Sequence, residues 1–372
     1  MARSILSTIL LTLLFTVTSL GQPAYQKPAL EHDSSWSVIL LPDIQNYTKW
    51  NRNQPILDLM MAWIEDNIDT LNIKMVLCTG DLVEQNDLLI PAHNGDQSAE
   101  SQWAFVARAF SRFNGKVPYI TALGNHDFSI DTTLKRTSRF DEFIKIDDNW
   151  LNKRALVQNG TNESGQQSLQ NAVYEVKSIN GGKDYLFMTV EYAPRDTVLT
   201  WAKKVAQLEQ YKNHRIVLLT HVYLSPDDKH WDGQNRWIIY QPYVINNKTV
   251  KSERYLLPFS NNGRQIWEKL VKPAANIELV MSGHISGEGY RADRNDGGKT
   301  VHQMLFDMQS AGGGHIHGNG GDGWLRILEF FPDNKTVKVK TFSPFFGSSP
   351  STRHLAWKTD DRNEYEFVFD NR

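Results

Sequence analysis

Five short polar clusters stand directly after apolar runs of the sequence, and they carry the residue types that bind metal ions. They lie at 42–46, 80–84, 124–127, 220–221 and 283–286 and contain Asp43, Gln45, Asp81, Glu84, Asn125, His126, Asp127, His221 and His284. Carboxylate, amide and imidazole groups are the ligands that proteins offer to divalent cations. One such cluster is weak evidence, because an Asp or Asn after a strand more often forms a turn. Five clusters in the same position relative to an apolar run predict a metal site.

The elements that must position these clusters alternate between short apolar runs and amphipathic segments. Strands are predicted at 36–41, 73–79, 117–122, 172–177, 185–192, 215–220, 277–281, 301–308, 324–331 and 337–342, and helices at 56–63, 99–113, 198–208 and 265–270. A polar stretch at 158–171 is predicted to be a loop. The alternation predicts an α/β protein with a mainly parallel sheet. Because parallel strands end at one edge of a sheet, we expect the polar clusters to converge there.

Composition excludes several classes of protein. The chain has 372 residues with 40 basic and 42 acidic side chains, so no excess of positive charge is available to hold duplex nucleic acid. The 24 glycines and 14 prolines are ordinary proportions, which excludes collagen-like and long disordered chains. The single cysteine, Cys78, rules out an intramolecular disulfide and is expected to be a small buried hydrophobe. The sequence says nothing about oligomeric state.

The first residues predict export from the cell. Arg3 precedes an uncharged run at 5–20, and the small residues Ser19 and Gly21 precede a cleavage point before Gln22. Residues 1–21 are therefore interpreted as a signal peptide, with an uncleaved membrane anchor as the alternative. We expect a secreted product, extracellular or periplasmic, with no membrane span after cleavage, one domain over 22–347 and a surface tail over 348–372.

The order of three motifs identifies a family resemblance. Gly80-Asp81, then Gly124-Asn125-His126-Asp127, then Gly283-His284 resemble the calcineurin-like metallophosphoesterases, and the resemblance extends over residues 36–345. The sequences of residues 41–48 and 322–326 are similar to those of a secreted branch of that family. The resemblance implies a four-layer α/β/β/α sandwich of two mixed sheets flanked by helices. It also implies hydrolysis of a phosphomonoester or phosphodiester by water that two divalent cations activate.

The same resemblance implies a role for each polar residue. One cation would be held by Asp43, Gln45 and Asp81, and the other by Asp81, Asn125, His221 and His284, with Asp81 bridging the pair. His126 would donate a proton to the leaving group, and Glu84 would orient His126. Asp127 would bond the loop or support a ligand. The cofactors implied are two divalent ions, with Mn, Zn, Fe and Mg as the candidates.

Two residues depart from the common family pattern. Gln45 stands where a histidine is usual, and Ser286 stands where many members have a second histidine. Both changes affect the same cation site and make it rich in oxygen ligands, which favours Mn²⁺, Mg²⁺ or ferrous iron. A catalytically weak metal-binding or ligand-binding protein therefore stays an alternative. Glu84 also occupies the position of the metal-binding tyrosine of purple acid phosphatases, which excludes that branch.

An insertion follows His221 and ends near Leu257. It contains Trp231, Arg236 and Trp237, which are candidate contacts for the organic and phosphate parts of a substrate. Packing of these aromatics against the body of the protein is an equal alternative. The insertion permits a phosphodiesterase that acts on nucleotides or lipid head groups, and the substrate is expected to be a small-molecule or macromolecular phosphate ester.

Two further motifs are not assigned to the site. Residues 318–323 formally match the G-x-G-x-x-G fingerprint, but a predicted strand follows where a dinucleotide site needs a helix. His315 and His317 lie in a glycine-rich stretch. They could bind metal or substrate phosphate, or be loop histidines without a role.

Overall fold

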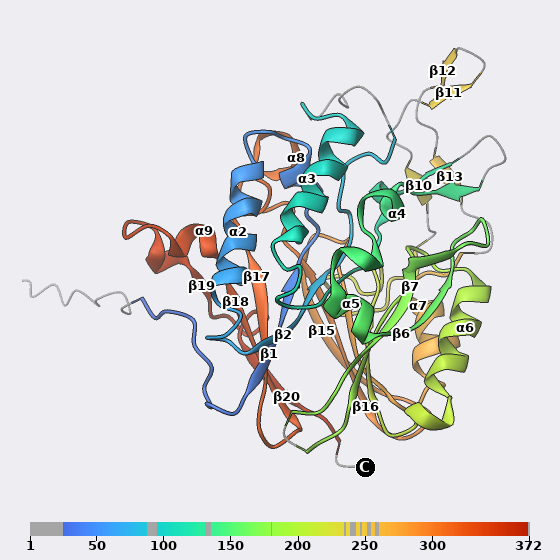
Figure 1. Ribbon diagram of the computed structural model, residues 1–372, viewed down its shortest axis with the longest axis vertical. Coiled ribbons are helices and arrows are strands. Elements are labelled where there is room, and N and C mark those ends of the chain that lie inside the picture. The colour runs from blue at the N-terminus through green and yellow to red at the C-terminus, as the bar shows by residue number, and fades with distance from the viewer. Residues whose placement is uncertain are drawn as a thin grey trace, which may run out of the picture.

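The computed structural model describes residues 25–87, 95–130, 135–179, 181–233, 236–238, 243–245, 248–250, 254–256 and 260–370. The predicted signal peptide lies outside these residues. Two seven-stranded sheets face each other, and helices cover their outer faces (Figure 1). Among the helices described, none has the length and apolar character that crossing a bilayer requires.

Both sheets are mixed, as the family resemblance implies. The first has the order β19 (Trp357–Lys358), β18 (Thr336–Phe342), β17 (Leu325–Phe330), β1 (Trp36–Leu41), β2 (Ile73–Cys78) and β3 (Tyr119–Thr121), with β20 (Tyr365–Val368) also paired to β18. The second has the order β15 (Gly287–Arg294), β16 (Thr300–Asp307), β14 (Ile277–Ser282), β9 (Arg215–Leu219), β8 (Tyr185–Thr189), β7 (Gln167–Val176) and β6 (Leu156–Thr161). The parallel strands are β1, β2 and β3, with β3 at the edge of the first sheet, and β8, β9, β14 and β16 in the interior of the second. The prediction of one mainly parallel sheet is therefore corrected to two mixed sheets.

Strand β1 shows why the central strands are apolar without interruption. All six of its residues are buried. Val38 and Leu40 belong to the core between the two sheets, whereas Ile39 and Leu41 pack under the helices of the first sheet. A strand that is buried on both faces has no polar side to alternate with its apolar one. Cys78 at the end of β2 is buried, as predicted.

The main helices cover the outer faces of the sheets. Helices α2 (Gln54–Asp66) and α3 (Ala99–Ser111) cover the first sheet, and α6 (Asp196–Ala206), α7 (Gly263–Ile266) and the following π-turn (Trp267–Val271) cover the second. The shorter helices are α1 (Gln45–Thr48), α4 (Phe140–Phe143), α5 (Trp150–Ala155), α8 (Gly314–His317) and α9 (Pro344–Gly347), with single 3₁₀ turns at Asn125–Asp127, Ile146–Asp148, Glu209–Tyr211 and Arg353–Leu355. Small hairpins pair β4 (Ser129–Ile130) with β5 (Arg136–Thr137), β10 (Arg236–Ile238) with β13 (Arg254–Leu256), and β11 (Tyr243–Ile245) with β12 (Lys248–Val250).

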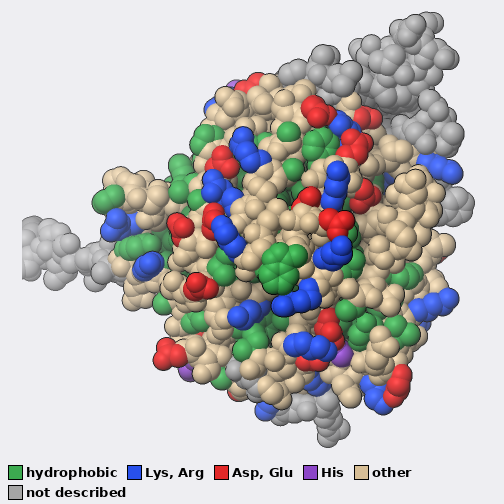
Figure 2. All heavy atoms as spheres, in the orientation of Figure 1, with side chains coloured by type: hydrophobic (Ala, Val, Ile, Leu, Met, Phe, Trp, Pro, Cys, Tyr) green, Lys and Arg blue, Asp and Glu red, His purple; other side chains and the backbone are tan. Residues whose placement is uncertain are grey.

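One sequence prediction about local structure is wrong. The polar stretch at 158–171 is mostly a hairpin of β6 and β7, because pairing across the turn satisfies its backbone groups. The buried face of α2 consists of Leu57, Met60, Met61 and Ile64, and Ile56 and Trp63 are partly buried against the same core. Figure 2 shows acidic and basic side chains interspersed over one face of the molecule, as the near-zero net charge leads one to expect.

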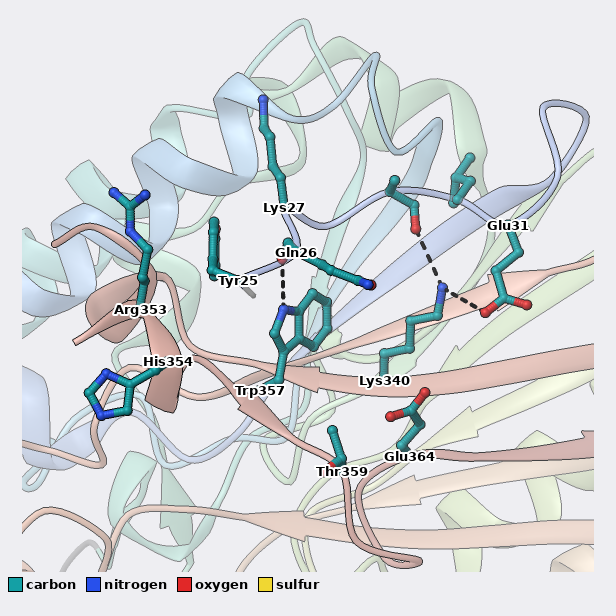
Figure 3. A pocket seen from close by; sticks show the side chains of 12 residues that line it. Tyr25, Gln26, Lys27, Glu31, Lys340, Arg353, His354, Trp357, Thr359 and Glu364 are labelled. Atoms are coloured by element: carbon teal, nitrogen blue, oxygen red, sulfur yellow. Dashed lines mark hydrogen bonds and ion pairs between the residues drawn. The ribbon is translucent and has the colours of Figure 1, made fainter. Parts of the chain in front are cut away.

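The last residues are part of the first sheet rather than a surface tail. Strands β19 and β20 both pair with β18, and Phe367 and Phe369 are buried in the core between the sheets. Trp357 of β19 donates its indole N–H to the carbonyl of Gln26, 2.8 Å away (Figure 3). This segment and the chain from Tyr25 to Glu31 together line a pocket of about 500 Å³. Tyr365, Phe367 and Phe369 stand at alternate positions, which is a strand pattern that the expectation of a surface tail overlooked.

We expect the protein to lose stability in acid because His302 of β16 is buried as a neutral ring. The Tyr290 hydroxyl lies 2.7 Å from Nδ1 of His302, and Nε2 lies 3.2 Å from the carbonyl of Val368. A neutral ring satisfies both contacts, because Nδ1 accepts from the hydroxyl and Nε2–H donates to the carbonyl. Burial lowers the pKa of His302 from 6.5 to about 4. The folded state thus prefers the neutral ring, and the free energy of unfolding should fall as the pH drops from 6.5 to 4, by up to about 3 kcal/mol from this group.

The measurement is urea unfolding of the wild type and of His302→Gln at pH 7.5 and pH 4.5. Gln can accept from Tyr290 and donate to the Val368 carbonyl, but it does not titrate. The variant should therefore lose less stability than the wild type between the two pH values. Equal losses in the two proteins would contradict the prediction.

Candidate metal centre

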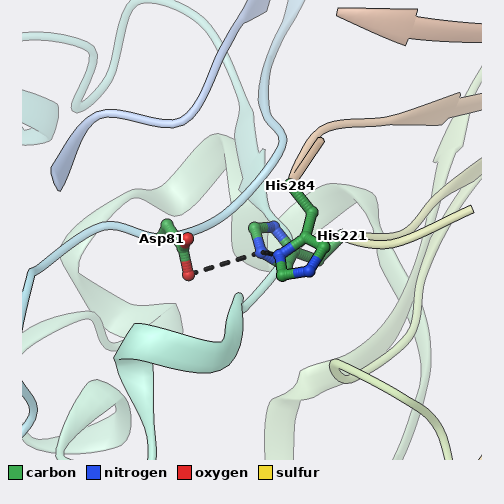
Figure 4. Close-up of side chains that lie close together, drawn as sticks. All are labelled: Asp81, His221 and His284. Atoms are coloured by element: carbon green, nitrogen blue, oxygen red, sulfur yellow. Dashed lines mark hydrogen bonds and ion pairs between the residues drawn. The ribbon is translucent and has the colours of Figure 1, made fainter. Parts of the chain in front are cut away.

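The five polar clusters converge because they follow the carboxyl ends of β1, β2, β3, β9 and β14. Figure 4 shows Asp81, His221 and His284 pointing toward one another from three different segments. The Nε2 atom of His221 lies 3.4 Å from Asp81 Oδ1, 3.2 Å from Asn125 Oδ1 and 3.1 Å from His284 Nδ1. The sequence prediction that these four residues come together is in agreement with this geometry.

The hydrogen bonds of this group fit a cation. His221 Nδ1 lies 2.9 Å from the carbonyl of Thr79 and must donate a proton to it, so Nε2 presents a lone pair in the neutral ring. That lone pair faces the oxygens of Asp81 and Asn125 and a nitrogen of His284. Lone pairs repel one another unless a positive charge stands between them. The donor set of one carboxylate, one amide oxygen and two imidazoles suits a divalent transition metal.

Electrostatics shows how tightly these groups are coupled. Burial disfavours a charged His221, but the carboxylates of Asp81 and Asp43 outweigh it and raise the pKa of His221 to about 10. Burial and the neighbouring His221 lower the pKa of His284 to about 3. The site therefore takes up one positive charge at the imidazole pair, which is the position where the family resemblance places a cation.

The other half of the centre is built on Asp43 and Gln45. Asp43 is fully buried, and its carboxylate accepts the Thr79 hydroxyl at 2.5 Å and the backbone N–H of His284 at 2.9 Å. Gln45 Nε2 lies 3.1 Å from Asp81 Oδ2, whereas Gln45 Oε1 is buried and has no hydrogen-bond partner. A buried amide oxygen without a donor is costly. A cation beside Asp81 would supply the missing partner.

Burial on the Gln45 side of the centre disfavours the ionised form of two carboxyl groups. Burial raises the pKa of Asp43 well above its usual value, and the nearby carboxylate of Asp307 raises it further. The pKa of Asp307 is raised to about 6, mainly by burial. A cluster of buried carboxylates of this kind is stabilised by a cation. Asp307 is the last residue of β16, and the sequence analysis missed it because it lies inside the strand predicted at 301–308.

Two of the candidate ligands lie on strained backbone. Asp81 has a φ of +46° and His284 a φ of +71°, in the left-handed region that side chains rarely adopt. Gly283 precedes His284, and a side chain there would collide with Asp43 and Thr79. The glycine in front of His284 therefore allows two strand ends to approach within contact distance.

His126 lies beside the ligands but is held differently from the prediction. Its backbone N–H donates to Asp81 Oδ1 at 3.0 Å, and its Nδ1 lies 2.8 Å from the backbone carbonyl of Glu84. The carboxylate of Glu84 is farther from Nδ1, at 4.0 Å. The role expected for the Glu84 side chain is therefore corrected: the group nearest Nδ1 of His126, and so placed to orient the ring, is the backbone carbonyl of Glu84 rather than its carboxylate.

The Glu84 side chain instead forms a buried ion pair. Its carboxylate lies 3.1 Å from Nζ of Lys49, and both side chains are almost completely buried. Burial lowers the pKa of Lys49, and the charge of Glu84 partly restores it. Sequence reasoning did not single out Lys49, since a lysine after a short helix has no distinctive pattern.

Lys49→Met should destabilise the fold by about 3–5 kcal/mol, because it leaves the Glu84 carboxylate buried without its cation. The free energy of unfolding in urea measures this loss. The double variant Lys49→Met/Glu84→Gln removes both charges and should recover most of it. A loss below about 1 kcal/mol for the single variant would show that the pair is not important for stability.

Asp127 forms hydrogen bonds that connect two loops of the centre. It accepts the backbone N–H groups of Leu82 at 2.7 Å, Val83 at 3.0 Å and Gly124 at 2.8 Å. Burial and the charge of Asp81 raise its pKa to about 7. Asp127 thus ties the loop after β2 to the loop after β3, which is one of the two roles expected from the sequence.

The remaining candidates lie at the rim or outside the described side chains. Trp231 is partly buried against the core under the helices, which supports the packing alternative. The backbones of Arg236 and Trp237 form β10, but their side chains lie outside the described part of the chain. His315 and His317 lie in α8, and His315 Nε2 is 3.5 Å from the hydroxyl of Ser310. Residues 318–323 lead into β17, so they form no dinucleotide site.

Comparison with known proteins decides the family. Residues 37–287 match the family model of calcineurin-like phosphoesterases. The chain belongs to the calcineurin-like phosphoesterase family. It is 27% identical over 324 residues to the uncharacterized protein YvnB of Bacillus subtilis. The matched region covers 83% of this chain but only 20% of YvnB. The chain thus spans about a fifth of the length of this relative.

Two solved structures are similar to this calcineurin-like phosphoesterase chain. One is GAP50, the anchor in the inner membrane complex of Plasmodium, with a TM-score of 0.42 and 12% identity over 88% of this chain and 91% of that one. The other is a candidate 5'-nucleotidase from Staphylococcus aureus in complex with alpha-ketoglutarate. It has a TM-score of 0.42 and 12% identity over 90% of this chain and 53% of that one.

Proposed function

We propose that this chain hydrolyses a phosphomonoester or a phosphodiester at a centre that holds two divalent cations. The observation that carries the proposal is the gathering of lone-pair atoms around His221 Nε2, next to the unpartnered Gln45 Oε1. The two groups are joined by Asp81, whose Oδ1 faces His221 and whose Oδ2 faces Gln45. A carboxylate with one oxygen in each group is placed to bridge two cations.

The ligands divide into two sets. Asn125, His221 and His284 would hold one cation, Asp43 and Gln45 the other, and Asp81 both. When bound, two such cations supply an acidified water and charge stabilisation for phosphoryl oxygens. The oxygen-rich set favours Mn²⁺, Mg²⁺ or Fe²⁺, and the set with two imidazoles favours Zn²⁺, Mn²⁺ or Fe²⁺.

His126 provides the proton for the leaving group in this proposal. Burial lowers the pKa of His126, but the charges of Asp81 and Glu84 outweigh it and raise the pKa above the usual value. Protonated His126 can donate from Nε2 while Nδ1 stays on the Glu84 carbonyl. Burial and the charge of Lys49 lower the pKa of His315, so His315 is a poorer candidate than His126 for this role.

The experiment is elemental analysis of the purified chain, paired with hydrolysis of p-nitrophenyl phosphate and bis-p-nitrophenyl phosphate after addition of Mn²⁺ or Zn²⁺. Two metals per chain with cleavage of either ester support the proposal, and the preferred ester separates phosphomonoesterase from phosphodiesterase. Bound metal without cleavage of either ester would favour the alternative of a metal-binding protein. Removal of the metals by a chelator should abolish turnover, and their return should restore it.

We also propose that the protein is exported by its first 21 residues. The support is the sequence pattern of Arg3, the apolar run at 5–20 and the small residues before Gln22. Sequencing of the N-terminus of the native protein from the extracellular or periplasmic fraction tests this. A chain that begins at Gln22 supports the proposal, and an intact Met1 in the membrane fraction would favour the anchor instead.

A further inference from the structure

The Gln45 side of the centre lacks the second histidine that the family resemblance leads one to expect. Ser286 occupies that position, is exposed, and bonds the Ser310 hydroxyl at 2.8 Å. Ser286 thus turns to the loop after β16 rather than to Gln45. The residue next to Ser310 is Gln309, which is buried and extends into the centre from the same loop.

The orientation of the Gln309 amide is set by Asp307. Asp307 accepts the backbone N–H of Gln309 at 2.9 Å and the side-chain Nε2 at 2.8 Å. Since the nitrogen of the amide is bound to a carboxylate, the oxygen must point the other way. Gln309 Oε1 accordingly lies 2.5 Å from Gln45 Nε2. Asp307 therefore acts as a positioning residue that aims an amide oxygen at Gln45.

The Gln45 amide nitrogen lies between two oxygens that could both bind a cation. These are Gln309 Oε1 at 2.5 Å and Asp81 Oδ2 at 3.1 Å, and the oxygen of the Gln45 amide has no partner. The oxygen and nitrogen of an amide exchange places by a half-turn of the amide group. After that turn three oxygens would face one another, which is stable only around a positive charge.

We propose that Gln309 is a ligand of the cation on the Gln45 side and takes the place of the imidazole that Ser286 does not provide. The proposal deepens the function proposed above and rests on it. The ligands of this cation are then all oxygens, from Asp43, Gln45, Asp81 and Gln309. A site of this kind prefers Mn²⁺ or Mg²⁺ over Zn²⁺, whereas the site of His221 and His284 does not.

The test is calorimetric titration of the chelator-treated full chain with Mn²⁺ alone. The wild type should show two binding events. Gln309→Leu should weaken one event at least about tenfold and leave the other unchanged, which corresponds to the loss of one ligand. Gln309→Glu keeps a ligand oxygen but loses the amide donor to Asp307, so it should bind two Mn²⁺ ions with affinities closer to the wild type.

Two controls separate the outcomes. Gln303→Leu changes an equally buried glutamine on β16 that bonds Tyr223 and His230 instead, and both Mn²⁺ events should persist. Thermal unfolding without metal shows whether each variant folds, and Gln309→Met replaces Gln309→Leu if the latter does not.

Wild-type affinities for both ions in Gln309→Leu would overturn the inference and leave the proposed function standing. Equal losses in Gln309→Leu and Gln309→Glu would also overturn it, because they would show that Gln309 acts only through its hydrogen bond to Asp307. If the wild type itself binds no Mn²⁺ and cleaves neither ester, the proposed function fails as well.

Discussion

Asp81→Asn should reduce hydrolysis of p-nitrophenyl phosphate or its bis-ester by about 10³-fold or more. The substitution removes the negative charge that faces both groups of ligands, and loss of several kcal/mol of transition-state stabilisation corresponds to a factor of this size. The fold should survive, because Asn tolerates the left-handed φ of +46° and its oxygen can still accept the His126 N–H. The measurement is kcat/KM together with metal content by elemental analysis.

The matched control for this variant is Asp228→Asn. Asp228 also has a left-handed backbone, with a φ of +61°, but it pairs with Arg362 outside the centre. Its variant should keep wild-type turnover and metal content. The metal content of Asp81→Asn should fall, since one residue serves both cations. Unchanged turnover in Asp81→Asn would refute the bridged two-cation centre.

His126→Ala should slow hydrolysis by about 10²- to 10⁴-fold while metal content stays at the wild-type level. The backbone N–H of His126 donates to the candidate ligand Asp81, and alanine retains this hydrogen bond. The ring itself is held by the Glu84 carbonyl and can be removed without taking away a ligand. Activity should therefore fall for lack of a proton donor rather than for lack of metal.

The leaving group makes this prediction specific. A p-nitrophenolate leaves without much help from an acid, whereas an alkoxide needs a proton, so the loss should be larger for alkyl phosphates than for p-nitrophenyl phosphate. His354→Ala, at an exposed histidine near Tyr25 and Trp357, should behave as the wild type. Equal losses for all leaving groups, or loss of metal in His126→Ala, would assign His126 a structural role.

Much of the centre follows from local sequence. The apolar runs of β1, β2, β9 and β14 and the polar residues after them can be recognised one segment at a time, because a buried parallel strand is apolar throughout and ends where polar residues begin. Parallel strands then bring their ends to one edge of a sheet. This made it predictable that Asp43, Asp81 and Asn125 would lie near one another, and likewise His221 and His284, whereas the two groups meet because the two sheets pack face to face.

The rest depended on contacts between distant segments. The bond between Gln45 and Gln309 joins residues 264 positions apart, and that between Lys49 and Glu84 joins residues 35 apart. No local pattern marks such partners, since each is an ordinary polar residue until burial makes its hydrogen bonds obligatory.

The sequence by itself therefore determined the type of protein and the residue types of its centre: an α/β fold of the calcineurin-like family with carboxylates, amides and imidazoles at its strand ends. Only the tertiary structure decided that Glu84 pairs with Lys49 and that Gln309 faces Gln45. It also placed the last strands in the first sheet. The physical reason is that strand-forming patterns are local, whereas the partner of a buried polar group is set by which loops the folded sheets bring together.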